Sequence, residues 1–200
     1  MLLLGMVKNM ASAGLRLDKK DKEIITLLNE NPSISQDTIA MKINLSQPSV
    51  AMRLKKLKDI GAIINVYGMN PLKMGLYLAK IDVVTNNTTK ILNMFRDCPY
   101  FLNGFIVSGK SNLSLFFVGE DIATLEAIVD GHLRPNKEIQ NVEFNIIIGV
   151  AKDLILPVKM NIKRDDSPPC GIGISCKDCS IYGNRCLGCP VTGHYKGFLW

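Results

Sequence analysis

The feature that most constrains the fold is the segment 35–61, which predicts two helices joined by a tight turn. Ser35 is suited to cap a short helix over residues 36–42, because a serine oxygen accepts hydrogen bonds from the free amides of a first turn. Ser46 is suited in the same way to cap a longer helix that ends at Gly61. The turn between them is expected to consist of Ile43, Asn44 and Leu45.

The longer helix is expected to have one apolar and one polar face. Val50, Leu54 and Leu57 recur at helical spacing and should pack into a core. Glutamine and arginine on the other face offer donors and acceptors for base edges, and a helix N-terminus favours a nearby phosphate. The pattern therefore predicts a recognition helix for the major groove, with a solvated helix of an ordinary bundle as the alternative. The expected DNA contacts are Ser46, Gln47, Ser49, Arg53 and Lys56.

Residues 17–71 closely resemble the N-terminal domain of the leucine-responsive regulator/AsnC family of transcription factors, here of archaeal type. The resemblance rests on Leu17, Asp18, Asp21, Ser35, Leu45, Ser46, Val50, Arg53, Leu57, Gly61, Asn70 and Pro71. It implies a cytoplasmic regulator that binds double-stranded DNA as a dimer or a larger assembly. A net charge of +6 agrees with a polyanionic partner. We expect a leader over 1–14, a winged helix-turn-helix domain over 15–66 with a strand or wing at 62–66, and a linker over 67–75.

A second domain is expected over residues 76–160, with the element order βαββαβ of a ferredoxin-like fold. The predicted strands lie near 77–83, 102–107, 113–118 and 142–150, and the predicted helices near 88–98 and 122–132. The fold class is therefore α+β. Both helices should cover one face of the sheet, and apolar residues should leave the other face to a second copy of the chain, as the resemblance also implies. The residues assigned to that other face are Phe105, Leu115, Phe117 and Ile147.

The turn after the second strand of this domain is where the resemblance implies a small-molecule effector, an amino acid bound between dimers. The matching positions are Gly109 and Asn112. Asparagine replaces the aspartate common in the family, which removes a negative charge suited to an ammonium group. A tight hairpin turn at Gly109 is the alternative interpretation.

A linker over 161–169 is expected to lead to a cysteine-rich tail over 170–200. Its two CxxC pairs predict a metal site, with zinc in a tetrahedron of thiolates as the first expectation. An iron–sulfur cluster, with Cys170 as a spare ligand, and a disulfide framework are the alternatives. Cys98 is expected in the core and His132 at the surface or at a helix end. The expected metal ligands are Cys176, Cys179, Cys186 and Cys189.

The sequence carries no Gly-rich phosphate loop, nucleophile elbow or paired acid motif, so we expect no catalytic residues and no enzyme. Two alternatives stay open: a haem-pathway decarboxylase, a class that resembles the same family, and a metal-handling scaffold protein. No stretch reaches the length of a membrane span, and the apolar start of the chain is too short for a signal peptide. The apolar end of the chain should pack on the tail or the body, through Tyr195, Phe198, Leu199 and Trp200.

Overall fold

The computed structural model describes residues 17–171 and 175–200, so the expected leader over 1–14 lies outside the described residues. The chain divides into two compact units, Met1–Val66 and Tyr67–Trp200. Within the described residues, every helix is too short or too polar to cross a lipid bilayer.

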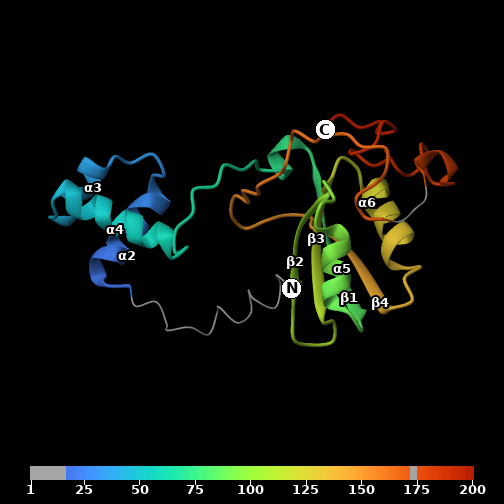
Figure 1. Ribbon diagram of the computed structural model, residues 1–200, viewed down its shortest axis with the longest axis horizontal. Coiled ribbons are helices and arrows are strands. Elements are labelled where there is room, and N and C mark those ends of the chain that lie inside the picture. Colours follow the sequence, from blue (N-terminus) through green and yellow to red (C-terminus); the bar gives the residue numbers. More distant parts are fainter. Residues whose placement is uncertain (1–16, 172–174) are drawn as a thin grey trace. The chain divides into compact units, whose positions relative to one another are not determined.

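The first unit contains three helices, α2 (Lys19–Glu30), α3 (Gln36–Ile43) and α4 (Gln47–Asp59) (Figure 1). Each helix follows a side chain that accepts a hydrogen bond from the helix's first turn. These capping residues are Asp18, Ser35 and Ser46, and the sequence predicted the two serines. Local capping chemistry therefore sets where all three helices begin.

The tight turn between α3 and α4 is built on Asn44. Its φ of 53° places it in the left-handed region, which asparagine tolerates better than most residues do. The turn brings the two helices onto a shared core with α2. The fully buried side chains of that core are Ile24, Ile39, Val50 and Leu57.

The predicted strand or wing at 62–66 was wrong: the described residues form no strand there. The backbone amides of Ala62 and Ile63 instead donate to the Leu57 carbonyl oxygen and complete the end of α4. A strand needs a hydrogen-bonded neighbour, and no described segment pairs with these residues. Ile64 is accordingly 74% exposed. The helix-turn-helix is present without a wing.

The second unit has the predicted order βαββαβ. Its elements are β1 (Tyr77–Thr85), α5 (Thr88–Phe95), β2 (Phe101–Ile106), β3 (Leu113–Gly119), α6 (Ile122–Ile128), a π-helical turn (Val129–Leu133) and β4 (Ile139–Ile146). The strands form one antiparallel sheet in the order β2-β3-β1-β4 (Figure 1). Short 3-10 turns lie at Leu72–Met74, inside the expected linker, and at Cys176–Asp178. This is an α+β, ferredoxin-like arrangement.

One face of the sheet packs against α5 and α6, and two residues assigned to the opposite face belong to this core instead. Leu115 and Phe117 are fully buried with Phe95 of α5 and Leu125 of α6. Phe105 does lie outside the core and is 49% exposed. The apolar run of β3 places apolar side chains on both faces, so alternation alone did not identify the covered one.

The end of the tail is anchored on Glu120, which directly follows β3. Its carboxylate accepts hydrogen bonds from the Tyr195 hydroxyl at 2.6 Å, the Leu199 amide at 2.8 Å and the Phe198 amide. Leu199 is buried, and the Trp200 ring lies 4.9 Å from that of Tyr100, edge to face. The predicted packing of the chain end is confirmed there. It was wrong for Phe198, whose side chain is 76% exposed.

Candidate nucleic-acid interface and cysteine-lined cavity

The N-terminal half of α4 presents polar side chains to solvent. Gln47 is exposed, and its Nε2 donates to Oε1 of Gln36 at 3.0 Å, which ties the start of α4 to the start of α3. The hydroxyls of Ser46 and Ser49 share a hydrogen bond of 2.8 Å. Lys56 is exposed and makes no side-chain hydrogen bond or ion pair with any described residue. Amide, hydroxyl and ammonium groups therefore line one surface of the helix.

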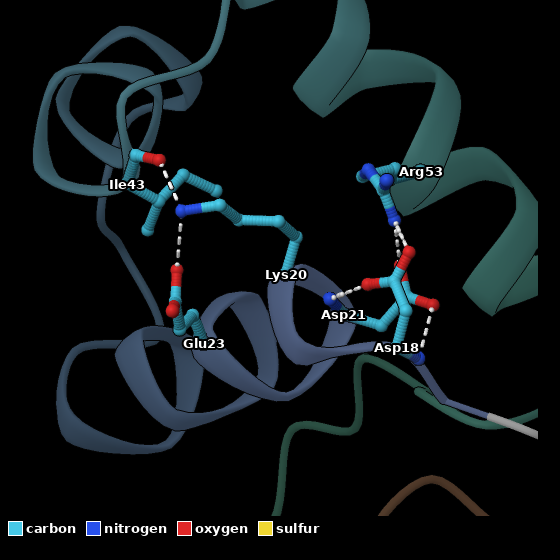
Figure 2. Close-up of polar contacts among 6 residues, drawn as sticks. All are labelled: Asp18, Lys20, Asp21, Glu23, Ile43 and Arg53. Carbon is cyan, nitrogen blue, oxygen red and sulfur yellow. Dashed lines mark hydrogen bonds and ion pairs between the residues drawn. The ribbon is translucent and has the colours of Figure 1, made fainter.

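Arg53, the remaining expected DNA contact, is held inside the first unit. Figure 2 shows its Nη1 between two carboxylates, 2.6 Å from Asp18 Oδ2 and 2.6 Å from Asp21 Oδ1. The Asp21 side chain is only 2% exposed, so this ion pair is partly desolvated. Arg53 thus fixes α4 to the start of α2, a role that sequence analysis missed because the partners are 35 and 32 residues away.

The two carboxylates also form the capping box of α2. The Asp21 amide donates to Asp18 Oδ1 at 2.8 Å, and the Asp18 amide donates to Asp21 Oδ2 at 3.2 Å. The Asp21 amide and then the Arg53 guanidinium lower the pKa of Asp18. Hydrogen bonds to Asp18 and Asp21 in turn raise the pKa of Arg53. The charged forms of Asp18 and Arg53 are therefore favoured in the folded unit.

Lys20 makes a second link across the first unit (Figure 2). Its ammonium group donates to the Ile43 carbonyl oxygen at 2.6 Å and pairs with Glu23 at 2.9 Å. Ile43 ends α3, where carbonyl oxygens lack helical partners. The start of α2 is thereby joined to both α3 and α4.

The expected effector positions lie at the β2–β3 turn, and one of them is occupied by backbone contacts. Gly109 has a φ of 140°, which favours glycine. The Asn112 side chain donates to the Thr85 carbonyl oxygen at 2.7 Å and accepts from the Thr85 amide at 3.0 Å. Asn112 thus bridges to the end of β1, where the β1–β4 register shifts.

All six cysteines of the sequence line one cavity of about 130 Å³ in the second unit. The sulfur-bearing residues are Cys98, Cys170, Cys176, Cys179, Cys186 and Cys189. Much of the remaining wall is apolar and includes Tyr100, Ala127, Ile128 and Ile181. Within residues 17–171 and 175–200, no three Cys, His, Asp or Glu side chains are grouped so as to hold one metal ion. The thiols predicted as ligands share a cavity, and their binding of zinc stays a prediction.

Turns in the tail bring the two CxxC pairs to the cavity. The first pair spans the 3-10 turn Cys176–Asp178, and the Cys179 amide donates to the Cys176 carbonyl oxygen at 3.2 Å. The Gly183 amide donates to the Cys186 carbonyl oxygen at 2.9 Å, and its φ of 76° makes the return turn. Gly188, with φ 90°, lies between the second pair, where a Cβ would come 2.8 Å from the His194 carbonyl oxygen.

Polar contacts hold the second CxxC pair on the ferredoxin-like domain. The Leu187 amide donates to Thr124 Oγ1 at 3.1 Å, and the Tyr100 hydroxyl donates to the Gly188 carbonyl oxygen at 2.8 Å. The Arg185 guanidinium lies 3.1 Å from a carboxylate oxygen of Glu126 and of Asp130. The cavity is thus built jointly by the tail and by α6.

His132, expected at the surface or at a helix end, is half-buried in the last turn of the π-helical segment and contacts Cys170. Its Nδ1 lies 2.9 Å from the Ile128 carbonyl oxygen and therefore donates to it, which leaves Nε2 to accept from the Cys170 thiol at 3.2 Å. Burial lowers the pKa of His132 to about 4, in agreement with a neutral ring. The two residues are 38 positions apart in the sequence, so no local sequence pattern predicts this contact.

Burial also affects the thiols that line the cavity. It raises the pKa of Cys98 to about 12 and that of Cys189 to about 11, and it also raises the pKa of Cys186. A buried thiol keeps its proton because the apolar wall disfavours the thiolate.

The helix geometry agrees with a match to a known family: the model of the AsnC-type helix-turn-helix domain covers residues 17–58. This segment is therefore similar to AsnC-type helix-turn-helix domains. It includes α2, α3 and nearly all of α4, together with the Arg53 ion pairs. The family resemblance predicted for the N-terminal part of the chain is thereby confirmed.

Relatives that extend beyond this segment are transcriptional regulators by name. An uncharacterised helix-turn-helix regulator of Pyrococcus horikoshii is 26% identical over 68% of this chain and 96% of its own length. Transcriptional regulator AzlB of Bacillus subtilis is 27% identical over 70% of this chain and 93% of its own length. These names support the prediction that the chain is a DNA-binding regulator and not an enzyme.

Solved structures show the same fold at low identity. AsnC of Escherichia coli has a TM-score of 0.62 at 17% identity and covers 69% of this chain and 96% of its own. A complex of a Neisseria meningitidis regulator with L-Met has a TM-score of 0.62 at 22% identity, over 73% of this chain and 98% of that one. Each match leaves more than a quarter of this chain without a counterpart.

Proposed function

We propose that this chain is a sequence-specific DNA-binding transcriptional regulator of the AsnC type that acts as a dimer or a larger assembly. The observation that carries the proposal is the AsnC-type helix-turn-helix over residues 17–58, whose α4 offers an exposed polar surface. We assign base and phosphate contacts to the N-terminal half and outer face of α4. The contacting residues are Ser46, Gln47, Ser49 and Lys56, with Arg53 as the residue that orients the helix.

The chemistry of these side chains suits a duplex. The Gln47 amide presents both a donor and an acceptor to a base edge, and the Lys56 ammonium group is available for a phosphate. The hydrogen bond between Gln47 and Gln36 holds the first turn of α4 against α3. In helix-turn-helix motifs the helix that precedes the recognition helix crosses the DNA backbone. Base contacts then specify the site, while phosphate contacts supply much of the affinity.

Selection of binding sites from random duplex DNA by the full-length protein tests this function. We expect an enriched motif with two related half-sites, and an affinity that falls steeply with salt. Lys56→Ala should weaken binding to all sequences and reduce the salt slope by about one. Lys137→Ala is a matched control, because Lys137 is an exposed lysine of the second unit. Selection that enriches no motif would contradict sequence-specific binding.

We propose that assembly and ligand response belong to the second unit. A second copy of the chain would cover the open face of the sheet, and a small amino acid would bind near Gly109 at the β2–β3 turn. The relative crystallised with L-Met supports this class of ligand. Because both polar groups of Asn112 already bind Thr85, we assign ligand contact to the backbone around Gly109.

We also propose that the two CxxC pairs bind a metal, zinc or iron, whose role is structural or regulatory. The convergence of all six cysteines on one cavity supports this role. Thiolates are ligands for both zinc and iron, and such a site stabilises a segment too small for a large core of its own. Metal analysis of the purified protein tests it.

A further inference from the structure

The arrangement of thiols around the cavity distinguishes between two kinds of metal centre. A single tetrahedral zinc ion, with Zn–S distances of about 2.3 Å, needs its sulfurs within about 3.8 Å of one another. The described residues offer no such group of three ligands around one ion. The same thiols do line a cavity of about 130 Å³, well above the roughly 10–15 Å³ that a cavity needs on the same measure to hold one water molecule.

We propose that this cavity binds an iron–sulfur cluster, ligated by Cys176, Cys179, Cys186 and Cys189. The inference rests on the metal-binding tail proposed above and specifies its chemistry. Four cysteine thiolates hold either a two-iron or a four-iron cluster, and inorganic sulfide fills the space between the irons. Each ligating thiol loses its proton to solvent as its Fe–S bond forms.

The other two cysteines have different environments. Cys170 contacts the ring of His132, which already accepts its thiol hydrogen. Cys98 packs against the core of the ferredoxin-like domain and contributes to the wall from the body side. The two CxxC pairs, by contrast, lie on turns of the tail, where short spacing places both thiols of a pair on one side. We therefore assign the four ligands to the CxxC pairs. Cys98 and Cys170 line the cavity without binding iron.

The wall of the cavity suits a cluster shielded from water. Tyr100, Ala127 and Ile128 from the body face the same space as the cysteines, and the Tyr100 hydroxyl is directed to the Gly188 carbonyl oxygen. Low solvent exposure and hydrogen bonding near the sulfurs are the means by which proteins set cluster potentials. Because α6 and the tail share this wall, cluster binding should also hold the tail on the second unit.

The test is anaerobic purification of the full chain, followed by incubation with ferric iron, a thiol reductant and sulfide in one sample and with zinc alone in another. We expect a brown protein with broad visible absorption, iron and sulfide in equal amounts, and about two or about four irons per chain. Limited proteolysis should cleave residues 170–200 more slowly in the reconstituted sample. A colourless protein that takes up about one zinc and no sulfide overturns the cluster while preserving a metal-binding tail. Protein that binds neither metal overturns both.

Matched variants assign the ligands. Cys179→Ser should lose most of the iron, sulfide and visible absorption, whereas Cys98→Ala and Cys170→Ser should retain them. Loss of the cluster in Cys98→Ala but not in Cys179→Ser would overturn the assignment. Circular dichroism shows whether each variant keeps its sheet, and the wild-type reconstitution tests the cluster even if a variant fails to fold. DNA binding is measured separately, so its failure would count against the regulator and not against the cluster.

Discussion

Arg53 shows how one residue can have a structural role in a helix that is expected to bind DNA. Its guanidinium contacts the half-exposed carboxylate of Asp18 and the buried carboxylate of Asp21. Charge-assisted hydrogen bonds of this kind are stronger than neutral ones. Loss of the arginine would leave the Asp21 carboxylate in a buried position without its cation.

We therefore expect Arg53→Ala to lower the free energy of unfolding of the first unit by about 1–3 kcal/mol. Hydrogen exchange of the backbone amides of α2 and α4 in the full chain measures this change. Lys56→Ala is the control, because its exposed side chain should affect DNA affinity and leave amide protection intact. If Arg53→Ala abolished DNA binding without loosening α2, the arginine would be a base-reading residue.

The pH dependence of the same contact follows from Asp18. Its folded pKa lies below the ordinary 3.8, so its carboxylate stabilises the fold above that value and loses this effect as the pH falls through the folded pKa. Asp18→Asn keeps a capping oxygen but removes the charge. We expect the stability deficit of the variant to be constant above about pH 5 and to shrink at lower pH.

Denaturant titrations of wild type and variant between about pH 3 and pH 7 measure this difference. Asp59→Asn is a suitable control, since Asp59 is exposed and its side chain has no partner among the described residues. A deficit that stayed constant down to about pH 3 would mean that the charge of Asp18 contributes nothing to folding.

Residue-scale features were predictable where they are local. Ser35 and Ser46 were identified as caps because capping depends on residues within one turn. The Arg53 ion pairs and the His132–Cys170 contact join residues more than thirty positions apart, and sequence spacing contains no sign of them.

At the scale of elements, the tail depends on one carboxylate for its position. Glu120 is buried and accepts three hydrogen bonds from the last six residues of the chain. Glu120→Ala should free this end and lower the free energy of unfolding by about 1–3 kcal/mol, because two backbone amides lose their acceptor.

Trp200 makes this prediction easy to follow, since it is the one tryptophan in the sequence. Its fluorescence should shift toward that of a solvated indole in Glu120→Ala. Glu143→Ala is the matched control, because the Glu143 side chain is 48% exposed and, among the described residues, forms an ion pair with Lys110 alone. An unchanged Trp200 spectrum in Glu120→Ala would show that packing against Tyr100 suffices to hold the tail.

Elements were predicted correctly where periodicity and pairing agree. The alternation of Val142, Phe144 and Ile146 identified β4, which pairs with β1. The segment 62–66 has strand-like residues but no partner, so it forms no strand. The faces of β3 were assigned wrongly because Leu115 and Phe116 are both large and apolar, and only the packed helices decide between them.

At the scale of the whole molecule, the order of elements was enough to predict the ferredoxin-like sheet. Whether two copies of the chain associate depends instead on which side chains the sheet leaves exposed. Phe105, Ile106 and Val107 are 49%, 56% and 37% exposed at the end of β2, and the Phe105 ring packs edge to face on Phe116. Because successive strand residues point to opposite faces of the sheet, Phe105 lies with Phe116 on the face away from the core, and this aromatic pair is the part suited to a protein partner.

Phe105→Glu should therefore convert the proposed dimer into a monomer, because each copy of the interface would bury an unpaired charge. Light scattering coupled to size exclusion measures the mass directly. Phe198→Glu introduces the same charge at a phenylalanine that is 76% exposed in the tail, and it should leave the mass unchanged. Since a regulator of this type reads two half-sites with two copies of α4, the monomer should also lose affinity for paired half-sites and keep its weak affinity for one. A Phe105→Glu protein that remained dimeric would place the interface elsewhere on the second unit.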